Sequence, residues 1–228
     1  YNMPPCLVLK KDGSSLYHTR DLAAAIYRKN TYDFYKCIYV TAFDQGLHFA
    51  QFFKVLELMG YEWSKDLVHV PYGLVSLESG KMSTREGQVV FLQDLLDEAI
   101  AKTREIILEK NPELENVDEV AKQVGVGAVV FNDLFNNRIK DVVFSWDNVL
   151  NFDGETGPYV QYTFARASSI LRKAGYSDFH AEDMKGSCLN DEYAQESLKT
   201  IEEFPKKVKE AAERYEPYVI TRFTVSLA

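Results

Sequence analysis

Cysteine is rare in this sequence of 228 residues, and long apolar runs are missing from it. The three cysteines, Cys6, Cys37 and Cys188, are widely spaced, form no C-x-x-C pair and have no histidine at ligand spacing. They exclude a disulfide framework and give no indication of a metal site, and the reducing cytoplasm is the expected compartment. The apolar run from Val124 to Phe131 is well below the roughly 18 residues that a membrane-spanning helix needs, so no membrane association is expected.

Basic residues are outnumbered by acidic ones, with 26 Lys and Arg against 34 Asp and Glu and a net charge of −8. This balance excludes generic binding of a phosphate backbone by a basic domain, so nucleic acid would have to be bound through a local face. A hydrophobic content of 46% with 26% charged residues is typical of a folded globular chain. The chain begins at Tyr1 rather than at a methionine, and its last residues read as the middle of a helix, so we expect a piece of a longer protein.

Alternating strands and helices are indicated over the first third of the chain. An Asp-Gly turn between two short runs predicts a β-hairpin, and Thr19 is predicted to cap the helix that follows it. The predicted elements are strands at Cys6–Lys10 and Leu16–Thr19, a helix after Thr19, a strand at Lys36–Thr41, a helix at Gln45–Met59 ended by Gly60, and a strand at Leu67–Tyr72. The last three form a β-α-β unit, which implies parallel strands and ligands bound beyond their carboxyl ends.

Helices are predicted to dominate from Gln88 onward. The predicted elements are helices at Phe91–Lys110 and Val117–Asn137, the second interrupted by Gly125 and Gly127, a strand at Asp141–Phe144, a helix from Pro158 to Gly175, a charged helix at Asp191–Tyr215 broken at Pro205, and a last helix opened by Pro217. We place a domain boundary near Leu150. The expected fold class is therefore α/β over residues 1–150, followed by an α-helical bundle over residues 151–228.

A polar loop at residues 79–87 carries two cations, Lys81 and Arg85, and two hydroxyls, Ser83 and Thr84, between flanking glycines. Cations neutralise charge on phosphoryl oxygens while hydroxyl and backbone donors fix their geometry, so the loop is a candidate clamp for a nucleoside triphosphate. The alternative is an exposed, solvated loop without a ligand. The loop alone does not decide between the two.

The residues 81–85 resemble the K-M-S-K-S signature of class I aminoacyl-tRNA synthetases, and four further passages resemble the arginyl-tRNA synthetase family. These passages are Leu16–Ala25 (L-Y-H-T-R-D-L-A-A-A), Leu47–Phe53 (L-H-F-A-Q-F-F), Leu58–Trp63 (L-M-G-Y-E-W) and Asn151–Thr163 (N-F-D-G-E-T-G-P-Y-V-Q-Y-T), the last followed by Ala165-Arg166. They occur in the order expected for the family and extend over nearly the whole chain.

This resemblance implies the second half of a Rossmann-type class I catalytic domain over residues 1–150 and a truncated helical anticodon-binding domain over residues 151–228. It implies an enzyme that activates L-arginine with ATP and Mg and transfers it to the tRNA for arginine, without a permanently bound cofactor or resident metal. A monomeric, cytoplasmic enzyme is expected.

The resemblance also implies roles for individual residues. Tyr17, Asp21 and Gln45 would bind the substrate arginine; Lys81, Ser83 and Arg85 would be catalytic; His48, Gly73, Val75 and Met82 would bind ATP. Without the resemblance, Tyr17 and Asp21 would be read as a strand-end aromatic residue and a helix-start acid favoured by the helix dipole. On the same basis, His48 would be a structural histidine, and the segment from Gly73 to Val75 would be a plain strand-end turn.

The H-x-G-H signature, which contacts the ATP phosphates in class I synthetases, does not occur in these 228 residues. We therefore expect the isolated chain to be catalytically inactive. Thr84 stands at the second lysine of K-M-S-K-S, as is common in arginyl enzymes. Glu86 stands where the family often has lysine and Phe164 where it often has histidine, and these two departures bear on local tRNA or ATP contacts rather than on the family. Two alternatives stay open: a catalytically inert tRNA-binding or interaction module, and a class I synthetase for another amino acid.

Overall fold

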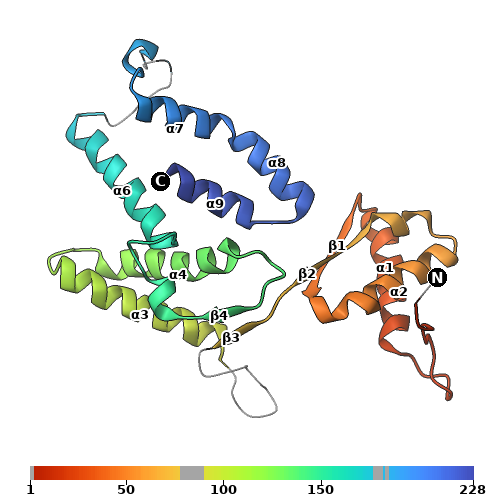
Figure 1. The fold of residues 1–228 in the computed structure, drawn as a ribbon. Coiled ribbons are helices and arrows are strands. Elements are labelled where there is room, and N and C mark those ends of the chain that lie inside the picture. The colour runs from red at the N-terminus through yellow and green to blue at the C-terminus, as the bar shows by residue number, and fades with distance from the viewer. Residues whose placement is uncertain (1–2, 78–89, 177–181, 183–184) are drawn as a thin grey trace. The chain divides into compact units, whose positions relative to one another are not determined.

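A computed structural model describes the chain except for residues 1–2, 78–89, 177–181 and 183–184 (Figure 1). Its residues divide by packing into two compact units, Tyr1–Leu74 and Val75–Ala228. Leu150 lies in the buried core of the second unit, and the helices α4 (Val117–Phe135) and α6 (Gly157–Lys173), on either side of it in the chain, pack together. The border between the compact units therefore lies elsewhere than residue 150, and the sequence-domain boundary near Leu150 stays a prediction.

The first unit contains the predicted β-α-β arrangement. Its elements are α1 (Tyr17–Tyr32), β1 (Cys37–Ala42), the 3-10 turn η1 (Phe43–Gln45), α2 (Gly46–Leu58), the 3-10 helix η2 (Glu62–Asp66) and β2 (Leu67–Tyr72). β1 and β2 are parallel, with register from Cys37 opposite Leu67 to Ala42 opposite Tyr72. This confirms the predicted parallel pair. Its core joins Leu22, Ala25, Phe49, Phe52, Leu56 and Leu67 from α1, α2 and β2.

The prediction of a strand at Leu16–Thr19 is wrong, because α1 already begins at Tyr17. Of the expected hairpin, one isolated antiparallel bridge between Leu9 and Ser15 is found among the described residues. The Thr19 hydroxyl accepts a hydrogen bond from the Leu16 amide at 3.0 Å and donates one to the Val8 carbonyl. Thr19 thereby satisfies a backbone donor at the start of the helix from inside its first turn rather than from the cap position, so the helix begins earlier than its spacing suggested.

The second unit is mostly helical, as predicted. Its elements are β3 (Val75–Leu77), α3 (Leu92–Lys110), α4 (Val117–Phe135), β4 (Val142–Phe144), α5 (Trp146–Val149), α6 (Gly157–Lys173), η4 (Gly186–Cys188), α7 (Glu192–Glu202), α8 (Phe204–Arg214) and α9 (Tyr218–Leu227). β3 and β4 form a parallel pair from Val75 opposite Val142 to Leu77 opposite Phe144. Residues Ala99, Ala128, Val129, Phe144, Val149 and Leu150 form its buried core.

The predicted interruption at Gly125 and Gly127 is wrong, because α4 runs through both residues. Gly125 lies against α3, where an added Cβ would be 2.8 Å from the Ala99 carbonyl oxygen. A Cβ at Gly127 would be 2.8 Å from the Nε2 atom of Gln161 in α6. Gly125 therefore serves the close approach of α3 to α4, whereas Gly127 is close only to the end of a flexible side chain, and neither glycine ends α4.

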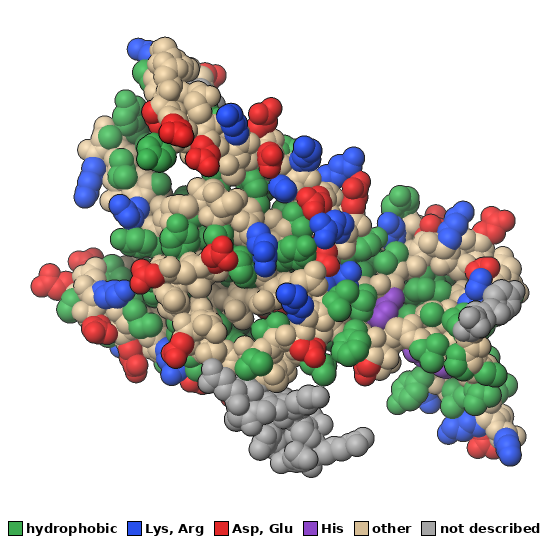
Figure 2. Space-filling model, in the orientation of Figure 1, with side chains coloured by type: hydrophobic (Ala, Val, Ile, Leu, Met, Phe, Trp, Pro, Cys, Tyr) green, Lys and Arg blue, Asp and Glu red, His purple; other side chains and the backbone are tan. Residues whose placement is uncertain are grey.

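The predicted helix ends in the last third are confirmed. Pro158 lies in the first turn of α6, and Gly175 follows that helix with a φ of 79°. The helix breaks at Glu203, between α7 and α8, and Pro205 lies in the first turn of α8, while Pro217 precedes α9. Blue and red side chains alternate over the region of α7 and α8 (Figure 2), and the pair Lys209–Glu213, 3.7 Å apart, is one of several on this surface. None of the described helices is long and apolar enough to cross a bilayer.

Candidate functional site

Two of the predicted site residues, Asp21 and His48, meet where α1 packs against α2. Asp21 lies in the second turn of α1 and His48 in the first turn of α2. The His48 Nε2 and Asp21 Oδ2 atoms are 2.7 Å apart. A carboxylate accepts hydrogen bonds, so the N–H group at His48 Nε2 is the donor of this hydrogen bond. The structure thus joins two residues that the resemblance had assigned to different ligands.

The two partners of this bond differ in exposure. The Asp21 side chain is 41% exposed and the His48 side chain 19%. The imidazole of His48 contacts the rings of Phe49 and Phe52, with centroids 5.2 and 6.3 Å away. The histidine is therefore the fixed partner, and the carboxylate is the end that solvent or a ligand can reach.

His18 is a further member of this cluster that sequence reasoning had not assigned. Its ring centroid is 4.3 Å from that of His48, and its Nε2 atom is buried without a hydrogen-bond partner among the described residues. Burial, and then the neighbouring His48, lower the pKa of His18, while Asp21 and Gln51 act in the opposite direction. His18 is therefore favoured in its neutral form beside the His48–Asp21 pair.

A signal for His18 was present in the sequence. His18 and Asp21 are three residues apart, which places both on one face of a helix. The expectation that Leu16–Thr19 is a strand concealed this relation, because it left His18 outside the helix.

Tyr17 and Gln45 flank the cluster along the chain. Tyr17 is the first residue of α1 and is 79% exposed, so it does not end a strand as predicted. Gln45 is the last residue of η1, directly before α2, and is exposed. Among the described residues, neither side chain is hydrogen-bonded to the Asp21 carboxylate. The structure brings Asp21 together with His48 and His18, and the joint role of Tyr17, Asp21 and Gln45 stays a prediction.

Gly73 and Val75 lie where the first unit gives way to the second. Gly73 is buried, and Val75 is the first residue of β3, paired with Val142 of β4. Val75 also lines an apolar hollow of about 510 Å³ inside the second unit, together with Leu96 and Val129 of α3 and α4. Gly73 and Leu74 therefore connect β2 to β3, and Val75 alone of this segment lies in a strand.

Lys81, Met82, Ser83 and Arg85, the loop expected to contact ATP, lie outside the described residues. Their assignment to the nucleotide stays a prediction. The described residues contain no group of three His, Cys, Asp or Glu side chains that could hold a metal ion.

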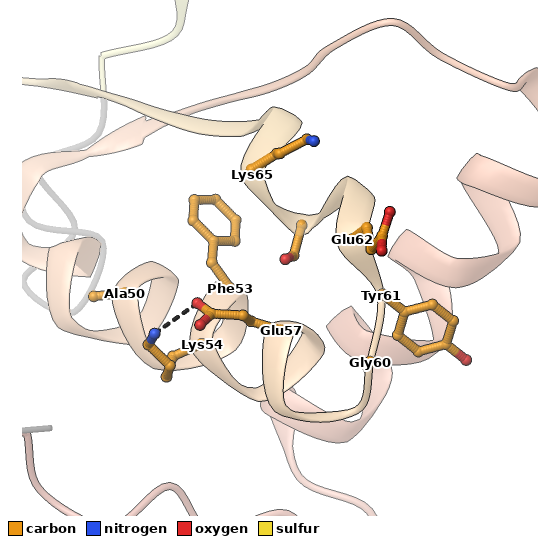
Figure 3. A pocket seen from close by; sticks show the side chains of 9 residues that line it. Ala50, Phe53, Lys54, Glu57, Gly60, Tyr61, Glu62 and Lys65 are labelled. Carbon is orange, nitrogen blue, oxygen red and sulfur yellow. Dashed lines mark hydrogen bonds and ion pairs between the residues drawn. The ribbon is translucent and has the colours of Figure 1, made fainter.

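A larger hollow of about 800 Å³ lies in the first unit between α2 and η2 (Figure 3). Its lining includes Lys54 and Glu57, whose charged groups are 2.6 Å apart, and also Glu62 and Lys65. Acidic and basic groups balance there, so the hollow favours no ligand of a definite charge. None of the predicted site residues lines it.

The Asp21 environment, in contrast, is suited to a cation. A partly exposed carboxylate with one oxygen bound by a fixed donor can form a charge-assisted hydrogen bond through its other oxygen, and such bonds are about twice as strong as neutral ones. A guanidinium or ammonium group is the complementary ligand.

Known proteins of similar sequence identify the family of this chain. Residues 2–146 match the family model described as tRNA synthetases class I (R), catalytic domain, and residues 160–228 match the DALR anticodon binding domain. The chain is 60% identical over its whole length to the arginine–tRNA ligase of Clostridioides difficile and 59% identical to that of Halothermothrix orenii. It spans 40% of the length of each of these relatives.

Solved structures give the same result. The fold is similar to that of Thermus thermophilus arginyl-tRNA synthetase, with a TM-score of 0.84 and 28% identity, over 97% of this chain and 41% of that one. The arginyl-tRNA synthetase of Plasmodium falciparum is similar with a TM-score of 0.80 and 26% identity, over 96% of this chain and 38% of that one.

Proposed function

Because the chain belongs to the class I arginyl-tRNA synthetase family, we propose that it supplies the arginine site and the K-M-S-K-S-like loop of an arginine–tRNA ligase. The complete enzyme activates L-arginine with ATP and Mg and transfers it to the tRNA for arginine. The 60% identity over the whole length of the chain supports this proposal. Since the chain spans 40% of the relatives' length, the activity is proposed for a longer polypeptide that contains it.

The observation that carries the arginine assignment is the Asp21 carboxylate at the meeting point of α1 and α2. It is 41% exposed and has one oxygen 2.7 Å from His48 Nε2. Asp21 supplies the negative charge that selects a cationic side chain or the α-ammonium group. Tyr17 contributes a phenol oxygen and Gln45 an amide, both directional groups that fix the orientation of the bound amino acid.

The nucleotide side of the site consists, in this proposal, of Lys81, Met82, Ser83 and Arg85 with Gly73 and Val75. ATP with Mg is a substrate complex, and the protein holds no permanent cofactor. Lys81 and Arg85 neutralise charge on the phosphates as the carboxylate of arginine attacks the α-phosphate and pyrophosphate leaves. Because this charge shifts during the reaction, the two cations contribute more to the transition state than to binding of the ground state.

The helical region over residues 151–228 is proposed to bind tRNA. The match of residues 160–228 to an anticodon-binding model, and of residues 2–146 to a catalytic model, supports a sequence-domain boundary near residue 150. The enzyme is proposed to act in the cytoplasm, where its tRNA substrate is used.

Aminoacylation by the full-length protein that carries this chain tests the proposal. Unfractionated tRNA is incubated with ATP, Mg and one labelled amino acid at a time. The proposal predicts that arginine alone is attached to tRNA. Attachment of a different amino acid would identify a synthetase of another specificity, and no attachment of any amino acid would identify a module without this activity.

A further inference from the structure

His48 is held by the protein in a way that suits a donor of fixed position. Its ring is packed against His18, Phe49 and Phe52, with centroid distances from 4.3 to 6.3 Å. Two of these rings belong to the same helix, α2, and the third to α1, so the imidazole is fixed from both helices. Rotation of the ring would cost these contacts, and Nε2 is therefore set in one direction.

Asp21 depends on this donor for its orientation. Its side chain is only partly buried, and among the described residues His48 is the one hydrogen-bond partner of its carboxylate. An aspartate on a helix surface without such a bond samples several rotamers. The bond to His48 Nε2 selects the rotamer in which Oδ2 faces the protein and leaves Oδ1 for another partner.

We propose that His48 is a positioning residue for the arginine site, which holds the Asp21 carboxylate through Oδ2 so that Oδ1 binds the cationic group of the substrate. The inference rests on the proposed function and replaces the expected contact of His48 with the nucleotide. The His48–Asp21 pair is more than a link between α1 and α2, because its more exposed member is the carboxylate, which a substrate can reach. An acid kept in one rotamer loses less conformational freedom when the substrate binds.

Steady-state kinetics of the full-length protein distinguish these roles of His48. His48→Phe keeps an aromatic ring against its three neighbours but removes the N–H donor. His48→Gln replaces the ring by an amide whose N–H group can reach the same carboxylate. His69→Phe is the matched control, since His69 lies in the same unit, stacks on Phe49 at 4.4 Å and is bonded to Thr41 instead of Asp21.

The proposal predicts that His48→Phe raises the KM for arginine about tenfold or more, the size of effect expected for a charge-assisted hydrogen bond. The KM for ATP should change by less than about twofold, because the nucleotide is not contacted. His48→Gln should restore the KM for arginine to within about threefold of the wild type. His69→Phe should leave the ratio of the two KM values unchanged.

Other results overturn the inference. A raised KM for ATP with an unchanged KM for arginine would return His48 to the nucleotide, and unchanged values for both in a folded His48→Phe variant would leave it a structural residue. If His48→Phe does not fold, His48→Met takes its place, since methionine matches glutamine in length without an N–H group. If the proposed function itself is wrong, the wild-type protein shows no activity with arginine, and this result distinguishes that case from a wrong role for His48.

Discussion

The ion pair between Arg138 and Glu216 is predicted to respond unequally to the loss of either charge. Arg138 lies after the end of α4, and Glu216 directly precedes Pro217 and α9; both residues belong to the second unit. Arg138 Nε and Glu216 Oε1 are 3.5 Å apart, and the side chains are 21% and 7% exposed. The second carboxylate oxygen of Glu216 is buried without a hydrogen-bond partner among the described residues. The acid is thus the more deeply buried partner.

The magnitude follows from distance and burial. At 3.5 Å and an effective dielectric constant of about 20, the Coulomb attraction is about 5 kcal/mol before the desolvation cost is subtracted. Arg138→Met leaves a buried carboxylate without this counter-ion, and the expected loss of unfolding free energy is about 3 kcal/mol. Glu216→Gln leaves a guanidinium that still reaches solvent and donates to the Tyr215 carbonyl, so the expected loss is about 1 kcal/mol.

The double variant separates the pair from its two members. With both charges removed, no buried ion remains, and the expected loss is about 1 kcal/mol rather than the sum of the single losses. Urea unfolding measures all three variants. The background substitution Trp63→Phe leaves Trp146, which packs against the core of the second unit, as the one tryptophan whose fluorescence is followed. Equal losses for the two single variants, or a double loss equal to their sum, would refute the reasoning.

Four further predictions concern the reaction, the helix packing and the pH dependence. The isolated chain should show no arginine-dependent ATP–pyrophosphate exchange above background with tRNA supplied, because it contains no H-x-G-H signature; measurable exchange would contradict this. In the full-length protein, Lys81→Ala and Arg85→Ala should lower the single-turnover rate of adenylation about a hundredfold while the Kd for arginine changes less than about threefold, and equal losses would indicate a structural loop. Gly125→Ala should lower stability by about 1 to 3 kcal/mol in urea unfolding despite its better helix propensity, because its Cβ would lie 2.8 Å from the Ala99 carbonyl oxygen. Since burial lowers the pKa of His18, the unfolded chain binds this proton more readily, and the stabilising contribution is present above a pH of about 6.5 and lost as the pH falls below it; thermal melting of His18→Phe should show a weaker loss across that range than the wild type.

Local sequence patterns predicted the bounds of an element correctly where residues at its own ends set them. The strand Leu67–Tyr72 was predicted with the bounds that the structure has, and Pro158 and Gly175 mark the ends of α6 as expected. The family and fold class were predictable from five separate motif passages, and the matches to a class I catalytic model and a DALR anticodon model confirm both.

The failures arose where a tertiary contact decides the local structure. At the start of α1, Thr19 accepts a bond from the Leu16 amide and also donates one to the Val8 carbonyl, 11 residues away in the chain. The continuity of α4 through Gly125 depends on its approach to α3. Neither contact can be read from local periodicity or propensity, because both need the neighbouring segment in place.

In the candidate site, too, the sequence identified a residue but not its tertiary contact. Asp21 was assigned from its motif, whereas its bond to His48, 27 residues away, depends on the packing of α1 against α2. The role of the Lys81 loop stays a prediction from the motif.

The central claim is that Asp21 selects a cationic amino acid for activation, and arginine-dependent ATP–pyrophosphate exchange by the full-length protein tests it most directly. The assay compares arginine with citrulline, its neutral isostere, in the presence of tRNA, for the wild type and for Asp21→Asn. The account predicts exchange with arginine, loss of about a hundredfold or more with citrulline, and a similar loss for Asp21→Asn with arginine. Comparable exchange with both amino acids, or no exchange with arginine by the wild type, would contradict it.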